Sequence, residues 1–157
     1  MMKAAHFITV FLFALVAGVF WGTWFSLSRS IDTISPSAFL EIGRTMIANL
    51  AWPMRFLMPG AMVASIWTLF LLRPSAGKSF YLGLTGLLLF AVALVITLLV
   101  NVPIDNLIKA WTVATLPSEW QQVRERWEFF HALRTFASLG ALASVIASSI
   151  VRTEKPH

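Results

Sequence analysis

Four long apolar runs constrain the fold of the 157-residue chain more than any other feature. Residues 4–28, 56–72 and 79–100 contain no Asp, Glu, Lys or Arg, and a fourth apolar run follows Arg134. A helix of about 20 apolar residues crosses the hydrocarbon core of a bilayer. The chain is 58% hydrophobic and 12% charged, whereas a soluble domain is about a quarter charged. We therefore expect an integral membrane protein.

The breaks between the runs predict one domain with four spans, at about residues 5–28, 54–73, 79–101 and 129–151. Pro53 is expected to kink or break the second helix, and Pro103 is expected to end the third. A short helix over 104–114 should follow, and Pro117 should restart one long helix that continues to 151. The predicted fold class is all-α: a membrane four-helix bundle with an extra-membrane cap of short or extended helices on one side.

Small residues recur every four positions in the first and last spans. Gly18 and Gly22 form one such pair, and Gly140, Ser144 and Ser148 form a longer seam. This spacing lets a neighbouring helix approach closely, either within the chain or in a homo-oligomer. The lipid bilayer is the first partner that the composition predicts.

Charge suggests the location and orientation of the protein. The net charge is +5, but the cations are scattered near the ends of apolar runs, which favours a lipid surface over nucleic acid. The first run is longer than a signal-peptide core, and no A-x-A-like cleavage site follows it. Four spans place both termini on one side, together with Lys3, Arg73, Lys78, Arg152 and Lys155. The other side has more cations in total, but the short flanks favour cytoplasmic termini, as expected in a bacterial plasma membrane.

One helical face carries the polar side chains that are hardest to explain by membrane anchoring alone. Positions that step by 4, 3, 4 and 3 share a face of a helix, and here they are Trp120, Arg124, Trp127, His131 and Arg134. An arginine at or below the membrane surface usually has a partner in the bundle interior, and Asp105, Glu41 and Glu128 are the candidates. The simpler interpretation is that these tryptophans and arginines are interfacial anchors.

Several classes of chemistry have no support in the sequence. The absence of cysteine excludes thiolate catalysis and Cys-ligated metals. The three histidines, at 6, 131 and 157, are far apart, and a single E-x-x-H, Glu128 to His131, falls short of a di-iron pattern. No nucleotide-binding motif occurs. We therefore predict no metal site.

The polar segment between the third and fourth spans resembles a known family. It reads N-V-P-I-D-N at 101–106, then Trp111, then W-x(3)-R-x-R-W-x(3)-H-x-x-R at 120–134. This pattern, with G-V-F-W-G at 18–22 and the stretch around Asn49, resembles the DUF1772 family, which includes the fungal anthrone oxygenases. Asp105 departs from it, because many relatives have asparagine there. The resemblance implies a small membrane enzyme that oxidises an anthrone to an anthraquinone without a metal or flavin cofactor.

The residues suit that chemistry. A base removes an acidic C–H proton from an anthrone-like or quinone-like lipophilic substrate, and the carbanion reacts with oxygen. His131 is the expected base, because its ordinary pKa is near neutrality. Oxyanion stabilisation is expected from Asn101, Arg126 or Arg134, and Asp105 adds a carboxylate. The predicted substrate-binding residues are Trp111, Trp120, Arg124, Trp127, Asn106, Arg44 and Asn49.

Two classes of function remain open at this point. The first is the cofactor-independent oxygenase. The second is a non-enzymatic membrane protein, which binds a lipophilic ligand or forms part of a larger complex. The small-residue seams fit both classes.

Overall fold

The computed structural model describes residues 1–73 and 77–153, which form helices joined by short connections. In chain order these are α1 (Met2–Ser26), η1 (Ser28–Thr33), α2 (Pro36–Leu72), α3 (Lys78–Ile96), η3 (Thr97–Asn101), α4 (Val102–Ala110), η4 (Val113–Thr115) and α5 (Trp120–Thr153). The predicted all-α class is confirmed. Residues 74–76, in the predicted break between the second and third spans, and Lys155 of the orientation argument lie outside the described residues.

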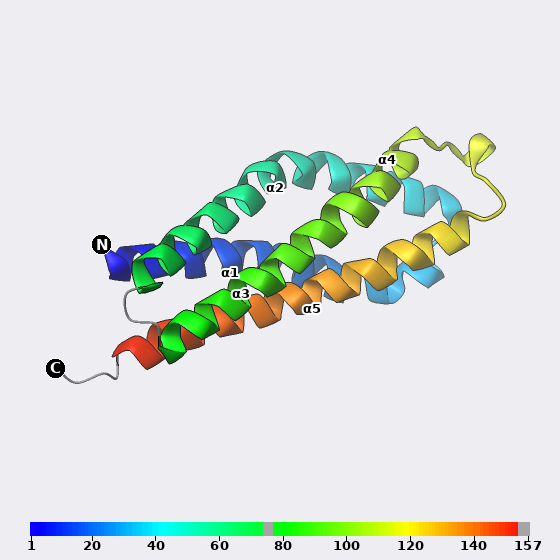
Figure 1. Ribbon diagram of the computed structural model, residues 1–157. Helices are drawn as coiled ribbons and strands as arrows, with labels where there is room; N and C mark the ends of the chain where they lie inside the picture. Colours follow the sequence, from blue (N-terminus) through cyan, green and yellow to red (C-terminus); the bar gives the residue numbers. More distant parts are fainter. Residues whose placement is uncertain (74–76, 154–157) are drawn as a thin grey trace.

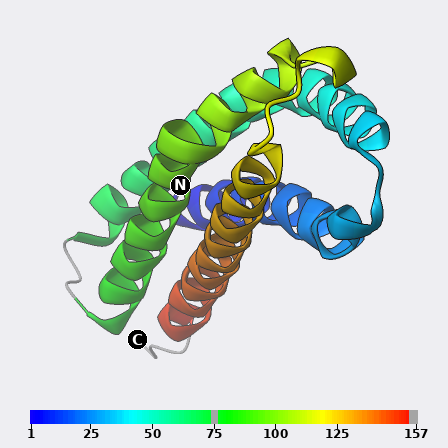
Figure 2. The ribbon, with the colours of Figure 1, turned by 90° about the vertical axis from the view of Figure 1, so that its right-hand side faces the viewer.

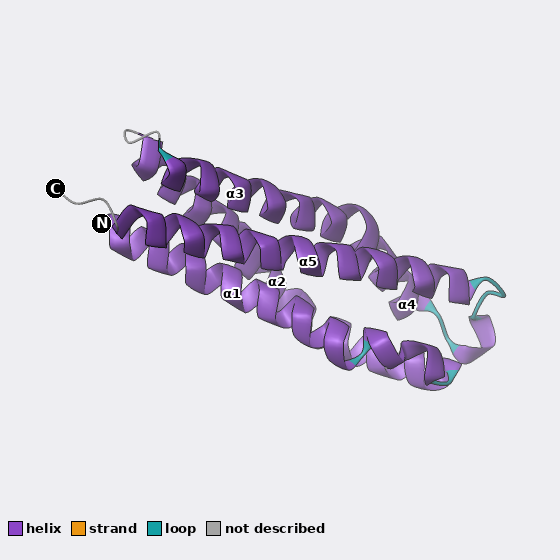
Figure 3. Ribbon diagram, turned by 90° about the horizontal axis from the view of Figure 1, so that it is seen from below, coloured by secondary structure: helices purple, strands orange, loops and turns teal. Residues whose placement is uncertain are grey.

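Within the described residues, four helical stretches are long and apolar enough to cross a membrane, which confirms the predicted four-helix membrane bundle. They are Met2–Thr33, Pro36–Leu72, Lys78–Ala110 and Trp120–Val151, so the second and fourth begin earlier than the expected spans. Helix α5 lies between α1 and α3, and α2 closes the ring by packing against α1 and α3 (Figure 1, Figure 3). The N-terminus and the C-terminal end of α5 lie together, at what we call the terminal end of the bundle (Figure 1). Figure 2 looks along the bundle from the opposite end, which we call the cap end.

Small residues bring α3 and α5 together toward the terminal end. A Cβ on Gly86 would lie 2.6 Å from Val145 Cγ2 and 3.1 Å from the carbonyl oxygen of Ala141, so glycine permits this approach. Ser79 Oγ donates to the Ser148 carbonyl at 2.7 Å, and Ser148 Oγ donates to the Ser79 carbonyl at 2.6 Å. The small-residue seam predicted in the last span thus packs against α3, as such seams do in lipid.

The glycine pair of the first span has a different environment. Gly18 and Gly22 are exposed, and nothing lies within 4 Å of a Cβ built on either one. Within the described part of the chain, therefore, no helix uses this surface of α1 for close packing.

Two separate apolar clusters hold the bundle together. The membrane cluster joins α1, α2, α3 and α5 through Phe13, Val16, Phe20, Met58, Ala61, Phe90, Ala141 and Val145. The cap cluster joins η1, α2 and α4 through Ile31, Phe39, Leu40, Ile104 and Ile108. Close packing stabilises the first cluster, since lipid is as apolar as the side chains. Exclusion of water contributes to the second wherever the cap end reaches beyond the bilayer.

The prolines affect the helices less than expected. Helix α2 runs without interruption through Pro53 and Pro59, and it bends visibly along its length (Figure 1). Each proline removes one backbone hydrogen bond, which is a common cause of such a bend. The expectation that Pro53 kinks the helix holds, whereas a break does not occur.

The expected stop at Pro103 is wrong. Helix α3 passes into η3, a single π-helical turn, and then directly into α4, so residues 101–106 are helical rather than a turn. Pro103 lies in the first turn after this π-helical turn, and the chain stays helical through it. The predicted short helix over 104–114 is in fact Val102–Ala110, followed by the separate turn η4.

Candidate functional site

A cavity of about 750 Å³ lies between the two apolar clusters, toward the cap end. The membrane cluster contributes Phe20 and Met58 to its wall, and the cap cluster contributes Ile31, Phe39 and Ile108. Most of the remaining wall is aliphatic or methionine. Its volume falls in the range of about 300–1,000 Å³ that is usual for small-molecule sites.

The polar side chains in this wall come mainly from α5 and from the η3–α4 segment. They include Thr97, Asp105, Trp127, His131 and Arg134. The π-helical turn matters here, because it carries α3 into α4 without a break and so sets the relative positions of Thr97 and Asp105. Single π-helical turns occur often at functional sites.

Arg134 is 8% exposed, and its hydrogen bonds go to neutral acceptors. Its Nε and Nη2 donate to Nδ1 of His131 at 3.1 and 2.9 Å, and its Nη1 donates to Thr97 Oγ1 at 3.2 Å. The guanidinium carbon also lies 4.4 Å from the centroid of the Phe20 ring. Among residues 1–73 and 77–153, no carboxylate lies within ion-pair distance of Arg134. The three acid partners expected for it do not pair with it, so this buried cation favours an anion in the cavity.

The hydrogen bonds of His131 fix its tautomer. A guanidinium only donates, so Nδ1 must accept and the proton of the neutral ring is on Nε2. His131 is 1% exposed. Its Nε2 is buried without a hydrogen-bond partner at normal geometry in the described structure, on the side of the Phe20 backbone. Neither ring nitrogen therefore offers a free lone pair to the cavity.

Asp105 is the acid in the cavity wall, and α5 orients it. Trp127 Nε1 donates to Asp105 Oδ1 at 2.9 Å, and Asn101 Nδ2 donates to the Trp127 carbonyl at 3.3 Å. The Asp105 side chain is half-buried, so it can contact both the cavity and its polar rim. Asn101 is fully buried, and its Oδ1 has no partner among the described groups.

One aromatic face is left for a flat ligand. The rings of Trp127 and His131 are stacked, with centroids 4.7 Å apart and planes 12° apart. Trp127 lines the cavity and is half-buried. Because His131 covers one face of the indole, only the other face can stack on a bound aromatic ring.

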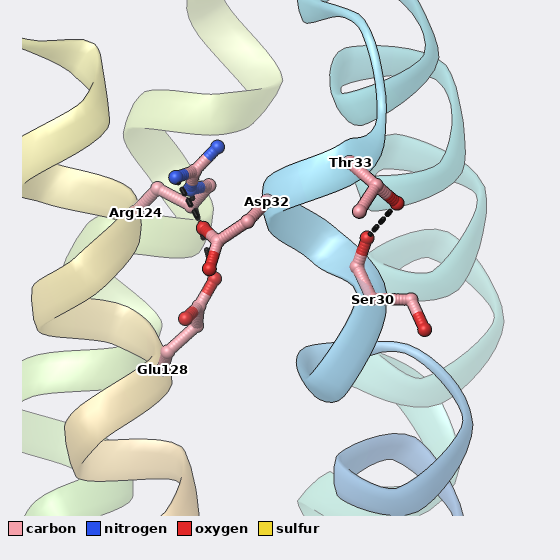
Figure 4. A network of polar contacts seen from close by, with 5 residues as sticks. All are labelled: Ser30, Asp32, Thr33, Arg124 and Glu128. Carbon is pink, nitrogen blue, oxygen red and sulfur yellow. Dashed lines mark hydrogen bonds and ion pairs between the residues drawn. The ribbon is translucent and has the colours of Figure 1, made fainter.

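The outer half of the predicted α5 face has a structural role. Arg124 forms an ion pair with Asp32 of η1, and its Nε lies 3.6 Å from Glu128 Oε1 (Figure 4). Trp120 packs against Phe39, with ring centroids 5.4 Å apart. In Figure 4, Asp32 lies between the side chains of Arg124 and Glu128. This network ties η1 to α5 and does not line the cavity.

The other candidate residues are distributed over the cap end. Asn106 lines the cavity, Trp111 packs against the cap cluster, and Arg44 lines a second pocket beside α2 and η4. Arg126 and Asn49 are exposed and line neither pocket. Among the described residues, no third His, Cys, Asp or Glu groups with Glu128 and His131 of the E-x-x-H.

Sequence reasoning missed four polar residues in the wall: Thr23, Arg55, Thr97 and Lys109. In the sequence, Arg55 marks the boundary of an apolar run, and Thr97 lies inside an uncharged run. No local pattern therefore distinguishes either residue from those that only anchor or fill a membrane span. Exposed apolar residues of α2 and the η3–α4 segment border the same cavity, and they are Val63, Leu98 and Val102. These residues lie on helical stretches that are long and apolar enough to cross a membrane.

Comparison with known proteins gives one match. A family model described as anthrone oxygenase matches residues 49–144, a segment that includes Asp105, Trp127, His131 and Arg134. No curated protein and no solved structure matches the chain.

Proposed function

Because the chain belongs to the anthrone oxygenase family, we propose that its cavity binds a lipophilic aromatic molecule and promotes its oxygenation. The observation that carries this proposal is the placement of Asp105 and Arg134 in one apolar cavity that is bordered by exposed apolar residues of candidate membrane spans. An anthrone-like or quinone-like substrate dissolves in the bilayer and reaches the cavity from there. Apolar walls with a few convergent polar groups are typical of such sites.

The reaction needs a proton acceptor and an anion-stabilising group. Asp105 removes the C–H proton of the substrate, and the resulting anion is delocalised onto the ring oxygen beside Arg134. Dioxygen takes up the electron pair, a C–O bond forms, and protonation gives a hydroperoxide. Loss of the second C–H proton and cleavage of the O–O bond release water and leave a carbonyl group.

The hydrogen bonds around His131 favour a positioning role in place of the base role expected from the sequence. Its Nδ1 accepts two bonds from Arg134, so it holds the guanidinium in the cavity wall. Trp127 orients Asp105 in the same way by donating to Oδ1. Asp105 and Arg134 are thus the groups that we assign to the reacting substrate.

Oxygen uptake tests the proposal. Purified protein in lipid nanodiscs should consume one dioxygen per dihydroxyanthrone, well above the rate in empty nanodiscs. Replacing Asp105 with the isosteric asparagine should lower turnover by about 10²–10⁴-fold, the usual contribution of a general base. Glu125→Gln, which removes an exposed acid of α5 that does not line the cavity, is the matched control. Full turnover in Asp105→Asn overturns the assignment, and no uptake by the wild type overturns the enzymatic function.

A non-enzymatic role is the alternative, and the exposed face of α1 favours it. Ala14, Gly18 and Gly22 are exposed, and both glycines have open space around them. A helix of another membrane protein, or of a second copy, fits such a surface. Ligand binding without oxygen uptake, together with copurification of a partner that Gly18→Leu abolishes, is the result that this alternative predicts.

The same proposal includes the orientation. We infer that the termini are cytoplasmic in a bacterial plasma membrane, which places the cavity near the opposite boundary. Cysteine-accessibility labelling at an exposed residue of the cap end, such as Glu125, tests this orientation, and labelling only from the cytoplasmic side contradicts it.

A further inference from the structure

Arg55 is a second cation of the cavity, and it has no role in the fold that the structure explains. It lies in the middle of α2, exposed between Pro53 and Pro59, and lines the cavity. In the described part of the chain it takes part in no hydrogen bond and no ion pair. Placing an arginine within a membrane-spanning stretch costs free energy, and such residues usually serve a function.

Arg55 lies at about the same depth as the groups of α5. Leu72 and Ser148 both approach Gly83, so they mark one level near the terminal end. With a rise of about 1.5 Å per residue, Arg55 lies roughly 26 Å above Leu72 along α2. By the same rise, Arg134 lies roughly 21 Å above Ser148 along α5. The two guanidinium groups therefore belong to facing walls of one cavity.

The charges of the wall do not balance. Its cations are Arg55, Lys109 and Arg134, and its acid is Asp105, with His131 neutral in the tautomer that Arg134 imposes. Arg134 is buried in apolar surroundings, where a positive charge selects an anionic ligand far more strongly than it would in water, and the exposed Arg55 and Lys109 add positive charge to the same lining. The substrate anion that forms during the proposed reaction explains why Arg134 lies in the cavity wall. It does not explain why Arg55 lies there.

We propose that Arg55 forms an anion subsite in the α2 wall, which binds an acidic substituent of the aromatic ligand. The substituent is a carboxylate or an ionised phenol remote from the reacting carbon. The ligand spans the cavity, with its reacting ring between Asp105 and Arg134 and its acidic group on Arg55. This inference rests on the proposed function, and it narrows the substrate class to lipophilic aromatic acids.

A lipid phosphate is the other source of an anion for Arg55, because an arginine near the bilayer boundary can extend to the headgroups. A ligand substituent and a lipid phosphate can be distinguished by the molecules that compete for binding to Arg55. A ligand subsite discriminates between acidic and neutral aromatic ligands, whereas a headgroup contact is sensitive to lipid composition and does not discriminate between them.

Binding of a matched pair of probes tests the proposal without turnover. Anthracene carboxylate and anthracene carboxamide are titrated by fluorescence into protein in zwitterionic nanodiscs, with empty nanodiscs to correct for partitioning into lipid. The wild type should prefer the carboxylate by about tenfold or more, as expected for a charge-assisted hydrogen bond. Arg55→Gln should remove this preference and leave carboxamide binding unchanged, which also shows that the variant folds. Arg55→Lys should keep part of the preference.

The control variant is Arg73→Gln, which removes an exposed arginine at the other end of α2 and should keep the full preference. A carboxylate preference that persists in Arg55→Gln overturns the proposal. So does a wild type that binds both probes equally and loses affinity only when anionic lipid is added, because Arg55 is then a headgroup contact. Equal oxygen uptake with acidic and neutral anthrones would overturn the subsite and leave the proposed oxygenase intact.

Discussion

The two ends of the bundle are packed in opposite ways. Toward the terminal end, Gly86 and the exchanged hydrogen bonds of Ser79 and Ser148 hold α3 and α5 in close contact. Toward the cap end, the same two helices enclose part of a cavity of about 750 Å³ whose wall contains buried charge. The close packing at one end fixes the helices, so the other end can stay hollow and hold a buried arginine.

The difference shows where the chain tolerates unfavourable contacts. At the terminal end, the buried hydroxyl groups of Thr9 and Thr68 satisfy each other with a hydrogen bond of 2.9 Å. At the cap end, Asn101 Oδ1 and His131 Nε2 are buried without partners among the described residues. Groups of this kind cost free energy in the folded state, and they concentrate at functional sites.

Of the effects that distinguish the two ends of the bundle, the largest is expected for substitutions of His131, at the cap end. If His131 positions Arg134, His131→Gln should keep turnover within about tenfold, because the amide oxygen can accept the same bonds. His131→Leu should lose about 10²-fold or more, the contribution of one oxyanion-stabilising donor. Anthrone turnover in nanodiscs measures both. Equal, severe losses in the two variants would restore His131 as the base.

A smaller effect is expected at the packed end. Gly86→Val places side-chain atoms against Val145 and the Ala141 backbone, so it should lower the free energy of unfolding by about 1–3 kcal/mol. Thermal unfolding in detergent measures this change, and Gly18→Ala is the control because its added Cβ meets open space. Equal melting temperatures for the wild type and Gly86→Val would show that α3 and α5 are not held as described.

The smallest effect is expected from the ion pair outside the cavity. The Asp32 side chain is 71% exposed, so Asp32→Asn should lower stability by only about 0–1 kcal/mol. Turnover should not change, since Arg124 and Asp32 do not line the cavity. Steady-state kinetics check this, and a turnover loss comparable to that of Asp105→Asn would extend the functional site to the cap surface.

Much of the fold could be predicted from the sequence because membrane spans have a strong physical signal. The four spans, the long last helix and the seam of small residues follow from length, hydropathy and spacing. The inner part of the polar face of α5 was also predictable, since Trp127, His131 and Arg134 share a helical face and line one cavity.

The remaining features depend on how the helices are arranged in three dimensions. The π-helical turn at Thr97–Asn101 has no local sequence signal. The sequence therefore indicates, wrongly, that the third helix ends at Pro103. The role of Arg55 becomes visible only when α2 faces α5 across the cavity. The separation of Arg124 from Arg134 has the same cause, because η1 approaches only the outer turns of α5.

The central claim is that the hollow cap end is a ligand site and that the packed terminal end is not. A structure of the protein in lipid nanodiscs with a stable dihydroxyanthraquinone, a product analogue, tests it most directly. We expect planar density in the cavity, stacked on the free face of Trp127, with an oxygen atom on the Arg134 guanidinium and the ring edge beside Asp105. A cavity that holds only lipid chains, with the ligand bound elsewhere on the bundle, would contradict it.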